Sequence, residues 1–360
     1  MKFEIMKNSY LLIGVCLVCL FAACTPVVDL NAPHKDVTVV YGILNQQSDT
    51  NFVKIYRGFQ TDKPGAVFLD AQNPDSIYYY DFEKKLSLID VFLLEYKDTV
   101  RTSRDPIELA ITHNFSRDSG FFYYDKERII YYTTAPLDKE KVYKIQIKNK
   151  ETGNITEGKT ELVGNFETIM NISYFDMLRE TASINYTEAK NAKHYFFNIN
   201  FIYFEVSKST NKVVKVGKIS RNLSPAIGEE VAKTAGGEAI KKFSPSFFDD
   251  IAGKLKEDPS VTRYIGTPGT NGVCIEVEGW AANDFLVKYL LSNKPTSTFI
   301  QINTKYTNLS STEGLAFGVL SSRARLTPRV FPTSKPSEDT LCFGNKTRHL
   351  GFRPWVEYKP

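Results

Sequence analysis

The sequence is poor in the residues on which metal and thiol chemistry depends. No two of its histidines show the spacing of an HExxH-type metal site, and they occur only at His34, His113, His194 and His349. Beyond residue 24 the chain holds just two cysteines, Cys274 and Cys342, which lie too far apart for a C-x-x-C site. We therefore expect no metal and no cofactor.

The chain also lacks a large excess of either charge. Its 45 basic residues nearly balance its 41 acidic ones and leave a formal net charge of +4. Without Lys2, Glu4 and Lys7 that charge becomes +3. So small an excess, with no basic block, is not typical of nucleic-acid binding or of electrostatic attachment to acidic membranes. No G-x-S-x-G motif occurs either, so the main signature of an α/β-hydrolase is missing.

The N-terminus has the pattern of a lipoprotein signal peptide over residues 1–23. Lys2 and Lys7 precede an apolar run, residues 11–20, that is shorter than the roughly 20 residues needed to span a bilayer. Phe21, Ala22 and Ala23 then lead into Cys24, whose thiol we predict to carry lipid such as palmitate. The alternative is an ordinary secreted protein that is cleaved elsewhere.

No second apolar run after Cys24 approaches the length of a membrane span. Residues 24–35 contain two prolines and little periodicity, which predicts a tether behind the lipidated cysteine. We expect everything beyond the tether to be soluble.

Residues 36–163 are predicted to form an immunoglobulin- or fibronectin-III-like β-sandwich. Its segments alternate apolar and polar residues, most clearly over 142–148, where Tyr143, Ile145 and Ile147 share a face. In the first strand, 36–44, Val37, Val39, Tyr41 and Ile43 share a face. The predicted strands are 36–44, 52–59, 86–96, 107–111, 121–124, 129–133, 142–148 and 156–163.

Residues 164–360 are predicted to form a larger β-sandwich with two inserted short helices. Its strands are expected at 194–207, 213–219, 273–279 and 314–323. Ser244-Pro245 and Asn283 are typical helix starts. The glycine-rich stretch 266–272 precedes a strand and lacks a lysine, which favours a connecting loop over a phosphate cradle. The fold class is therefore mainly β.

Three features leave alternatives open. Glu276 and Glu278 share one strand face at about 7 Å, which fits an acid/base pair but also the solvated face of a half-buried strand. Aromatic residues make up 13% of the chain and include consecutive runs at 78–80, 121–124 and 131–132, which fit either exposed binding surfaces or core packing. Cys274 and Cys342 could form a disulfide or remain two separate thiols.

Several segments, taken together in order, resemble a family of Bacteroidota envelope lipoproteins that carry a domain of unknown function. The segments are 38–45 with 53–57, 71–76, 185–186 with 191–195, 258–261 with 279–280, and 306–309 with 318–323. The resemblance implies a β-sandwich protein of the envelope, often encoded beside TonB-dependent outer-membrane transporters, and it implies no catalytic residues. Surface-exported members often carry acidic residues directly after the lipidated cysteine, whereas this chain has only Asp29 there. The sequence therefore does not indicate whether the periplasmic or the cell-surface leaflet of the outer membrane holds the protein.

The expected function is that of a non-enzymatic accessory or ligand-binding lipoprotein of the outer membrane, attached through Cys24 and acting with a TonB-dependent transporter. A fimbrial or adhesin-type subunit and an envelope hydrolase built on scattered carboxylates are the alternatives. The sequence does not indicate the ligand, the partner or the oligomeric state.

Overall fold

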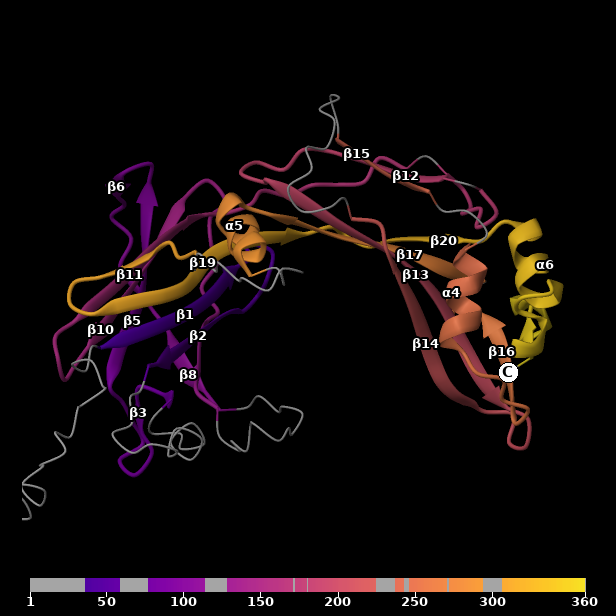
Figure 1. The fold of residues 1–360 in the computed structure, drawn as a ribbon, viewed down its shortest axis with the longest axis horizontal. Helices are drawn as coiled ribbons and strands as arrows, with labels where there is room; N and C mark the ends of the chain where they lie inside the picture. Colours follow the sequence, from indigo (N-terminus) through magenta and orange to yellow (C-terminus); the bar gives the residue numbers. More distant parts are fainter. Residues whose placement is uncertain are drawn as a thin grey trace, which may run out of the picture.

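The computed structural model describes residues 36–58, 77–113, 128–170, 172–179, 181–224, 237–242, 246–270, 272–293 and 306–359. The predicted signal peptide and tether lie outside these residues, as does the expected strand 121–124. The chain is mainly β, with 47% in strands and 13% in helices, which confirms the predicted fold class. Figure 1 shows two lobes, joined by chain that runs between the labels β19 and β17.

The first lobe is a β-sandwich. One layer has the order β19-β1-β2-β9-β8, and the other has the order β18-β11-β10-β5-β6 with β7 beside β5. The first layer contains β1 (Val37–Leu44), β2 (Asn51–Arg57), β8 (Ala110–Thr112), β9 (Ile130–Thr133) and β19 (Leu315–Arg325). The second contains β5 (Ile89–Lys97), β6 (Val100–Arg101), β7 (Ile107–Glu108), β10 (Val142–Asn149), β11 (Ile155–Glu161) and β18 (Leu309–Ser311). A small hairpin joins β3 (Tyr80–Asp81) to β4 (Leu86–Ser87).

The core of this sandwich is formed by alternate residues of both layers. Val40, Leu44, Val53 and Ile55 come from one layer, and they form one cluster with Tyr143, Ile145 and Ile147 of the other. The shared face of Val37, Val39, Tyr41 and Ile43 is therefore the outward face of β1, because Thr38, Val40 and Leu44 are the buried residues of that strand. Alternation alone could not decide between the two faces, since both are largely apolar.

The second lobe is built on the long strand β13 (His194–Ser207), whose bounds match the sequence prediction. It pairs with β14 (Val213–Asn222), β16 (Val261–Ile265) and β17 (Val273–Ala282). β20 (Arg329–Pro332) pairs with β17, and β21 (Phe352–Arg353) pairs with β16. A separate two-stranded ribbon joins β12 (Thr181–Tyr186) to β15 (Gly237–Lys242).

Helices cover one side of this sheet. Phe247, Phe248 and Ile251 of α4 (Ser246–Lys254) share one hydrophobic cluster with Phe197, Phe201 and Ile275 of the sheet. Leu341 and Cys342 of α6 (Lys335–Phe343) join the same cluster. Two 3-10 turns, η1 (Arg348–Leu350) and η2 (Trp355–Glu357), complete the C-terminal region.

Both predicted helices are present, and a third was not foreseen. Asn283 caps α5 (Asp284–Ser292) as predicted, with its side chain accepting a hydrogen bond from the Leu286 N–H. The described part of α4 starts at Ser246, whereas its predicted cap, residues 244–245, lies outside the described residues. α6 was not predicted, although Ser334 caps it and Pro336 occupies its first turn.

β19 connects the two lobes by contributing to both sheets. Residues 315–322 pair in parallel with β1, and residues 323–325 pair antiparallel with β17. Accordingly Leu320 belongs to the first core, whereas Ala324 belongs to the second. Up to β17, the buried residues through Leu162 belong to the first core and those from Val163 onward belong to the second. β18 and β19, although they come from beyond residue 164, belong to the sheets of the first sandwich.

Candidate functional site

The paired carboxylates of β17 are held in an ion-pair cluster. Lys218 of β14 places its Nζ 2.7 Å from Glu276 and 2.9 Å from Glu278, and Arg325 of β19 lies 3.5 Å from Glu278. Burial alone would raise the pKa of Glu278, but the hydrogen bond and charge of Lys218 outweigh it and lower that pKa below its usual value. A general acid needs the opposite shift, so this geometry favours a structural ion pair over acid/base chemistry.

The two cysteines are free thiols, in place of the disulfide that the sequence left open. Both are buried, Cys274 on β17 and Cys342 on α6, within the same hydrophobic cluster. Burial raises the pKa of each thiol to about 12, so neither holds a reactive thiolate near neutral pH.

Among the described residues, no three His, Cys, Asp or Glu side chains form a group that could hold a metal ion. The glycine-rich stretch 266–272 connects β16 to β17, as the loop interpretation predicts. In the parts of the chain that the structure describes, no helix has the length and apolar character needed to cross a membrane.

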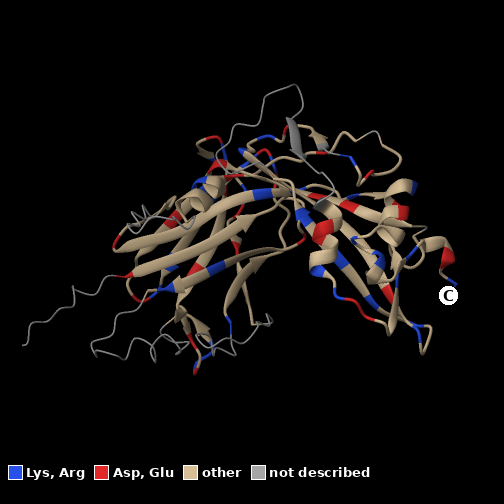
Figure 2. Cartoon of the chain, turned by 45° about the vertical axis from the view of Figure 1, so that its right-hand side comes forward, with Lys and Arg blue, Asp and Glu red and all other residues tan. Residues whose placement is uncertain are grey.

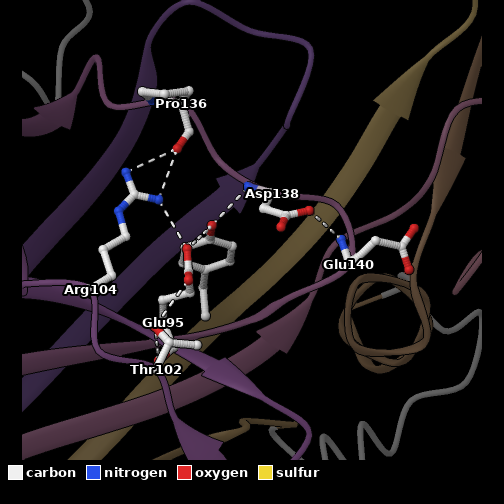
Figure 3. A network of polar contacts seen from close by, with 7 residues as sticks. Glu95, Thr102, Arg104, Pro136, Asp138 and Glu140 are labelled. Atoms are coloured by element: carbon white, nitrogen blue, oxygen red, sulfur yellow. Dashed lines mark hydrogen bonds and ion pairs between the residues drawn. The ribbon is translucent and has the colours of Figure 1, made fainter.

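A buried polar network lies at one end of the first sandwich (Figure 3). Glu95 of β5 accepts hydrogen bonds from Thr102 at 3.0 Å, Arg104 at 2.9 Å and the Tyr143 hydroxyl at 3.0 Å. The Tyr143 hydroxyl accepts one from the Asp138 N–H at 2.8 Å. Both carboxylate oxygens are thus occupied within the protein, so the network fixes the chain around Asp138 rather than offering a reactive group.

Opposing effects set the pKa values of this network. Burial would raise the pKa of Glu95, but hydrogen bonds from Arg104, Tyr143 and Thr102 lower it below its usual range. Burial raises the pKa of Tyr143 to about 12, and the neighbouring Glu95 carboxylate adds to that shift. The carboxylate is therefore ionised and the phenol neutral near neutral pH, which is the pairing that a strong hydrogen bond requires.

The consecutive tyrosines are largely core residues. Tyr78, Tyr79, Tyr80 and Tyr131 are all buried in the first core, whereas residues 121–124 lie outside the described residues. The packing interpretation holds for those four rings. The exposed aromatic side chains described next lie outside these consecutive aromatic runs.

That surface is the outward side of β19, β1 and β2, here called the outer apolar face. Four of its side chains keep substantial exposure: Tyr41 and Ile43 38% each, Phe52 40% and Leu315 44%. Ring contacts link Tyr41 to Tyr56 at 6.4 Å and to Tyr289 of α5 at 6.0 Å. The outer apolar face consists of Val37, Val39, Tyr41, Ile43, Phe52, Tyr56, Leu315 and Phe317.

A second apolar feature lies between α4 and α6 at the far end of the second lobe. It is a pocket of about 210 Å³, here called the helical pocket, lined by Leu178, Phe248, Thr340, Gly344, Asn345, Lys346 and Thr347. Leu178 is 39% exposed, and Phe343, next to the lining residue Gly344, is 58% exposed. Lys346 pairs with Asp249 of α4 at 2.6 Å beside it.

Sequence reasoning missed the helical pocket because its lining comes from three distant stretches, near residues 178, 248 and 340–347. The outer apolar face could have been found, since the alternate residues of the strand 36–44 were already marked as one face.

No protein-family model matches the chain, and no curated protein matches it. The resemblance to Bacteroidota lipoproteins therefore stays a prediction. What the fold establishes is a mainly β protein with two separate apolar surface features.

Proposed function

We propose that this chain is an outer-membrane lipoprotein, anchored through Cys24, that works without catalysis as a binding partner of a TonB-dependent transporter. The observation that carries the proposal is the helical pocket with its exposed rim. The signal-peptide pattern that ends at Cys24, the family resemblance and the ion pairing of Glu276 and Glu278 with Lys218 support it.

The helical pocket suits the anchor residue of a protein partner. Interface hot spots bury a single aromatic or aliphatic side chain in a preformed pocket and exclude water around it. A cavity of about 150 Å³ holds benzene, so 210 Å³ is ample for one leucine or phenylalanine side chain. Ile169, Ile172 and Tyr174 are 49%, 38% and 50% exposed in the stretch leading to Leu178, and they would extend such a contact.

The helical pocket is also held in shape by the fold. Thr347 donates from its hydroxyl to the Thr340 carbonyl at 3.1 Å, and the Gly344 N–H donates to the same carbonyl at 2.8 Å. These bonds satisfy polar groups of the wall internally, which leaves an apolar interior for the partner.

The test is site-specific photocrosslinking in living cells. A photoreactive amino acid at Leu178 should form an adduct with a TonB-dependent transporter. The control is the same amino acid at Val214, which is 56% exposed on β14 of the same lobe. Identical adducts from both positions, or none from position 178, would contradict the proposed docking. Leu178→Asp should reduce co-purification of the transporter, whereas Val214→Asp should not.

A further inference from the structure

One part of the rim of the helical pocket is Leu178, which lies beside the junction between β20 and α6. The chain just before it is well fixed. The Phe175 N–H donates to the Pro332 carbonyl at 2.8 Å, and the Ser334 N–H donates to the Phe175 carbonyl at 2.9 Å. Met177 is fully buried in the core of the second lobe. Leu178 leaves that core with 39% exposure, so its position depends on other contacts.

A single carboxylate links Leu178 to the start of α6. Oδ1 of Asp176 accepts a hydrogen bond from the Leu178 N–H at 3.0 Å and one from the Ser337 hydroxyl at 2.9 Å. The Ser334 hydroxyl lies 3.2 Å from the same oxygen. The Ser337 hydroxyl also accepts from the Met177 N–H at 2.9 Å. The turn that carries Leu178 is therefore attached to the helix that forms another wall of the helical pocket.

The same contacts keep the carboxylate of Asp176 charged. Burial would raise its pKa, but hydrogen bonds from Leu178, Ser337 and Ser334 outweigh burial and lower the pKa below its usual value. The N-terminal end of a helix also favours a negative charge. An ionised acceptor forms a hydrogen bond roughly twice as strong as a neutral one, so the attachment of the turn is a strong one near neutral pH.

Charge around the helical pocket offers a partner little guidance. Acidic and basic residues are interspersed over the described parts of both lobes (Figure 2). Beside the pocket, Lys346 pairs with Asp249 at 2.6 Å, and Arg179 lies 3.8 Å from Asp176. Mixed charges of this kind produce no strong long-range field. Recognition therefore depends on the shape of the apolar pocket, and with it on the position of Leu178.

We infer that Asp176 is a positioning residue of the docking site, which holds Leu178 in place so that the helical pocket is formed before the partner arrives. The inference rests on the proposed function, because it assigns Asp176 a role in the docking of the transporter. Apparent affinity falls with the fraction of molecules that hold the binding-competent conformation. Without the carboxylate the Leu178 N–H loses its acceptor, whereas buried Met177 still attaches the chain to the core.

The experiment compares tagged, full-length chains with Asp176→Ala and with Asp176→Asn, which keeps an acceptor oxygen. The matched control is Asp258→Ala. Oδ1 of Asp258 accepts from the Ser260 N–H at 2.9 Å and from the Ser260 hydroxyl at 2.6 Å, which is the same type of turn outside the pocket lining. Each chain is purified from detergent-solubilised envelopes, and the retained transporter is quantified by mass spectrometry. Hydrogen exchange is measured on the same chains produced in a host without the transporter.

We expect Asp176→Ala to retain several-fold less transporter than the wild-type chain. Exchange at Leu178 should become faster, while exchange in β13 stays unchanged. Asp176→Asn should recover much of the retention, and Asp258→Ala should match the wild type. Ser337→Ala removes one donor to the carboxylate and should cause a smaller loss, so it tests the inference even where Asp176→Ala does not fold.

Two results are distinguishable. Wild-type retention by Asp176→Ala, despite faster exchange at Leu178, overturns the positioning role and leaves the proposed docking intact. Wild-type retention by Ser337→Ala counts against the positioning role in the same way. A wild-type chain that retains no transporter refutes the docking itself and, with it, the inference.

Discussion

Replacing Gly318 with alanine should destabilise the first sandwich far more than the added methyl group suggests. Gly318 lies in β19 opposite Val40 of β1, with φ of +93°. A Cβ atom at this position would collide with the Val40 carbonyl, whose carbon would be only 2.9 Å away. The obstacle is main chain, so it cannot rotate aside as a flexible side chain can.

The expected cost has two parts. An L-residue in left-handed backbone geometry costs about 1–2 kcal/mol, and forcing an extra carbon into a packed site costs about 1–3 kcal/mol. Together they predict a loss of about 2–5 kcal/mol in the free energy of unfolding. For a domain of 150–250 residues that corresponds to a fall in Tm on the order of 10 °C.

Two other glycines separate these parts. Gly153, in the turn between β10 and β11, has φ of +75° but no atom within 4 Å of an added Cβ, so Gly153→Ala should lose only about 1–2 kcal/mol. Gly253 lies in α4 with open space around it, so Gly253→Ala should be neutral or gain up to about 1 kcal/mol. Thermal unfolding followed by circular dichroism measures all three. Equal losses for Gly318→Ala and Gly153→Ala would refute the close approach of β19 to β1.

Three further predictions concern the buried polar groups. Folding lowers the pKa of Glu95, so its ionised carboxylate stabilises the fold above the unfolded pKa of about 4.3, and this stabilisation is lost as the pH falls through the folded pKa. Glu95→Gln should therefore lower the free energy of unfolding by about 1–3 kcal/mol near neutral pH. The loss should shrink progressively in urea unfolding curves recorded at acidic pH. Ser334→Ala removes the cap of α6 and should cost about 1 kcal/mol, measured by the fluorescence of Trp280 and Trp355; an unchanged midpoint would count against the cap. Cys274 and Cys342 should resist maleimide in the folded protein and react in denaturant, and rapid labelling of the folded protein would contradict their burial.

Much of the β architecture could be predicted because it depends on local alternation. The strand β13 shows this best, since Tyr195, Phe197, Ile199 and Phe201 recur at every second residue and its bounds match the prediction. The cap at Asn283 was equally local. Such signals depend on neighbouring residues and need no knowledge of the partner strand.

Features that depend on distant contacts could not be predicted. The return of β19 to pair with β1 joins residues nearly 280 positions apart, as the Ser321–Gly42 hydrogen bond illustrates. α6 was missed because its apolar residues Leu341 and Cys342 lie among polar ones, so its periodicity is weak. The helical pocket likewise exists only once three separate stretches meet.

Affinity purification of the tagged, full-length protein from detergent-solubilised envelopes, followed by mass spectrometry, tests the proposed partnership with a transporter. We expect a TonB-dependent transporter in stoichiometric amount with the wild-type chain and with Val214→Asp, and a marked loss with Leu178→Asp. A protein that purifies alone from outer membranes, or a partner retained equally by all three chains, would contradict the proposed role of the helical pocket.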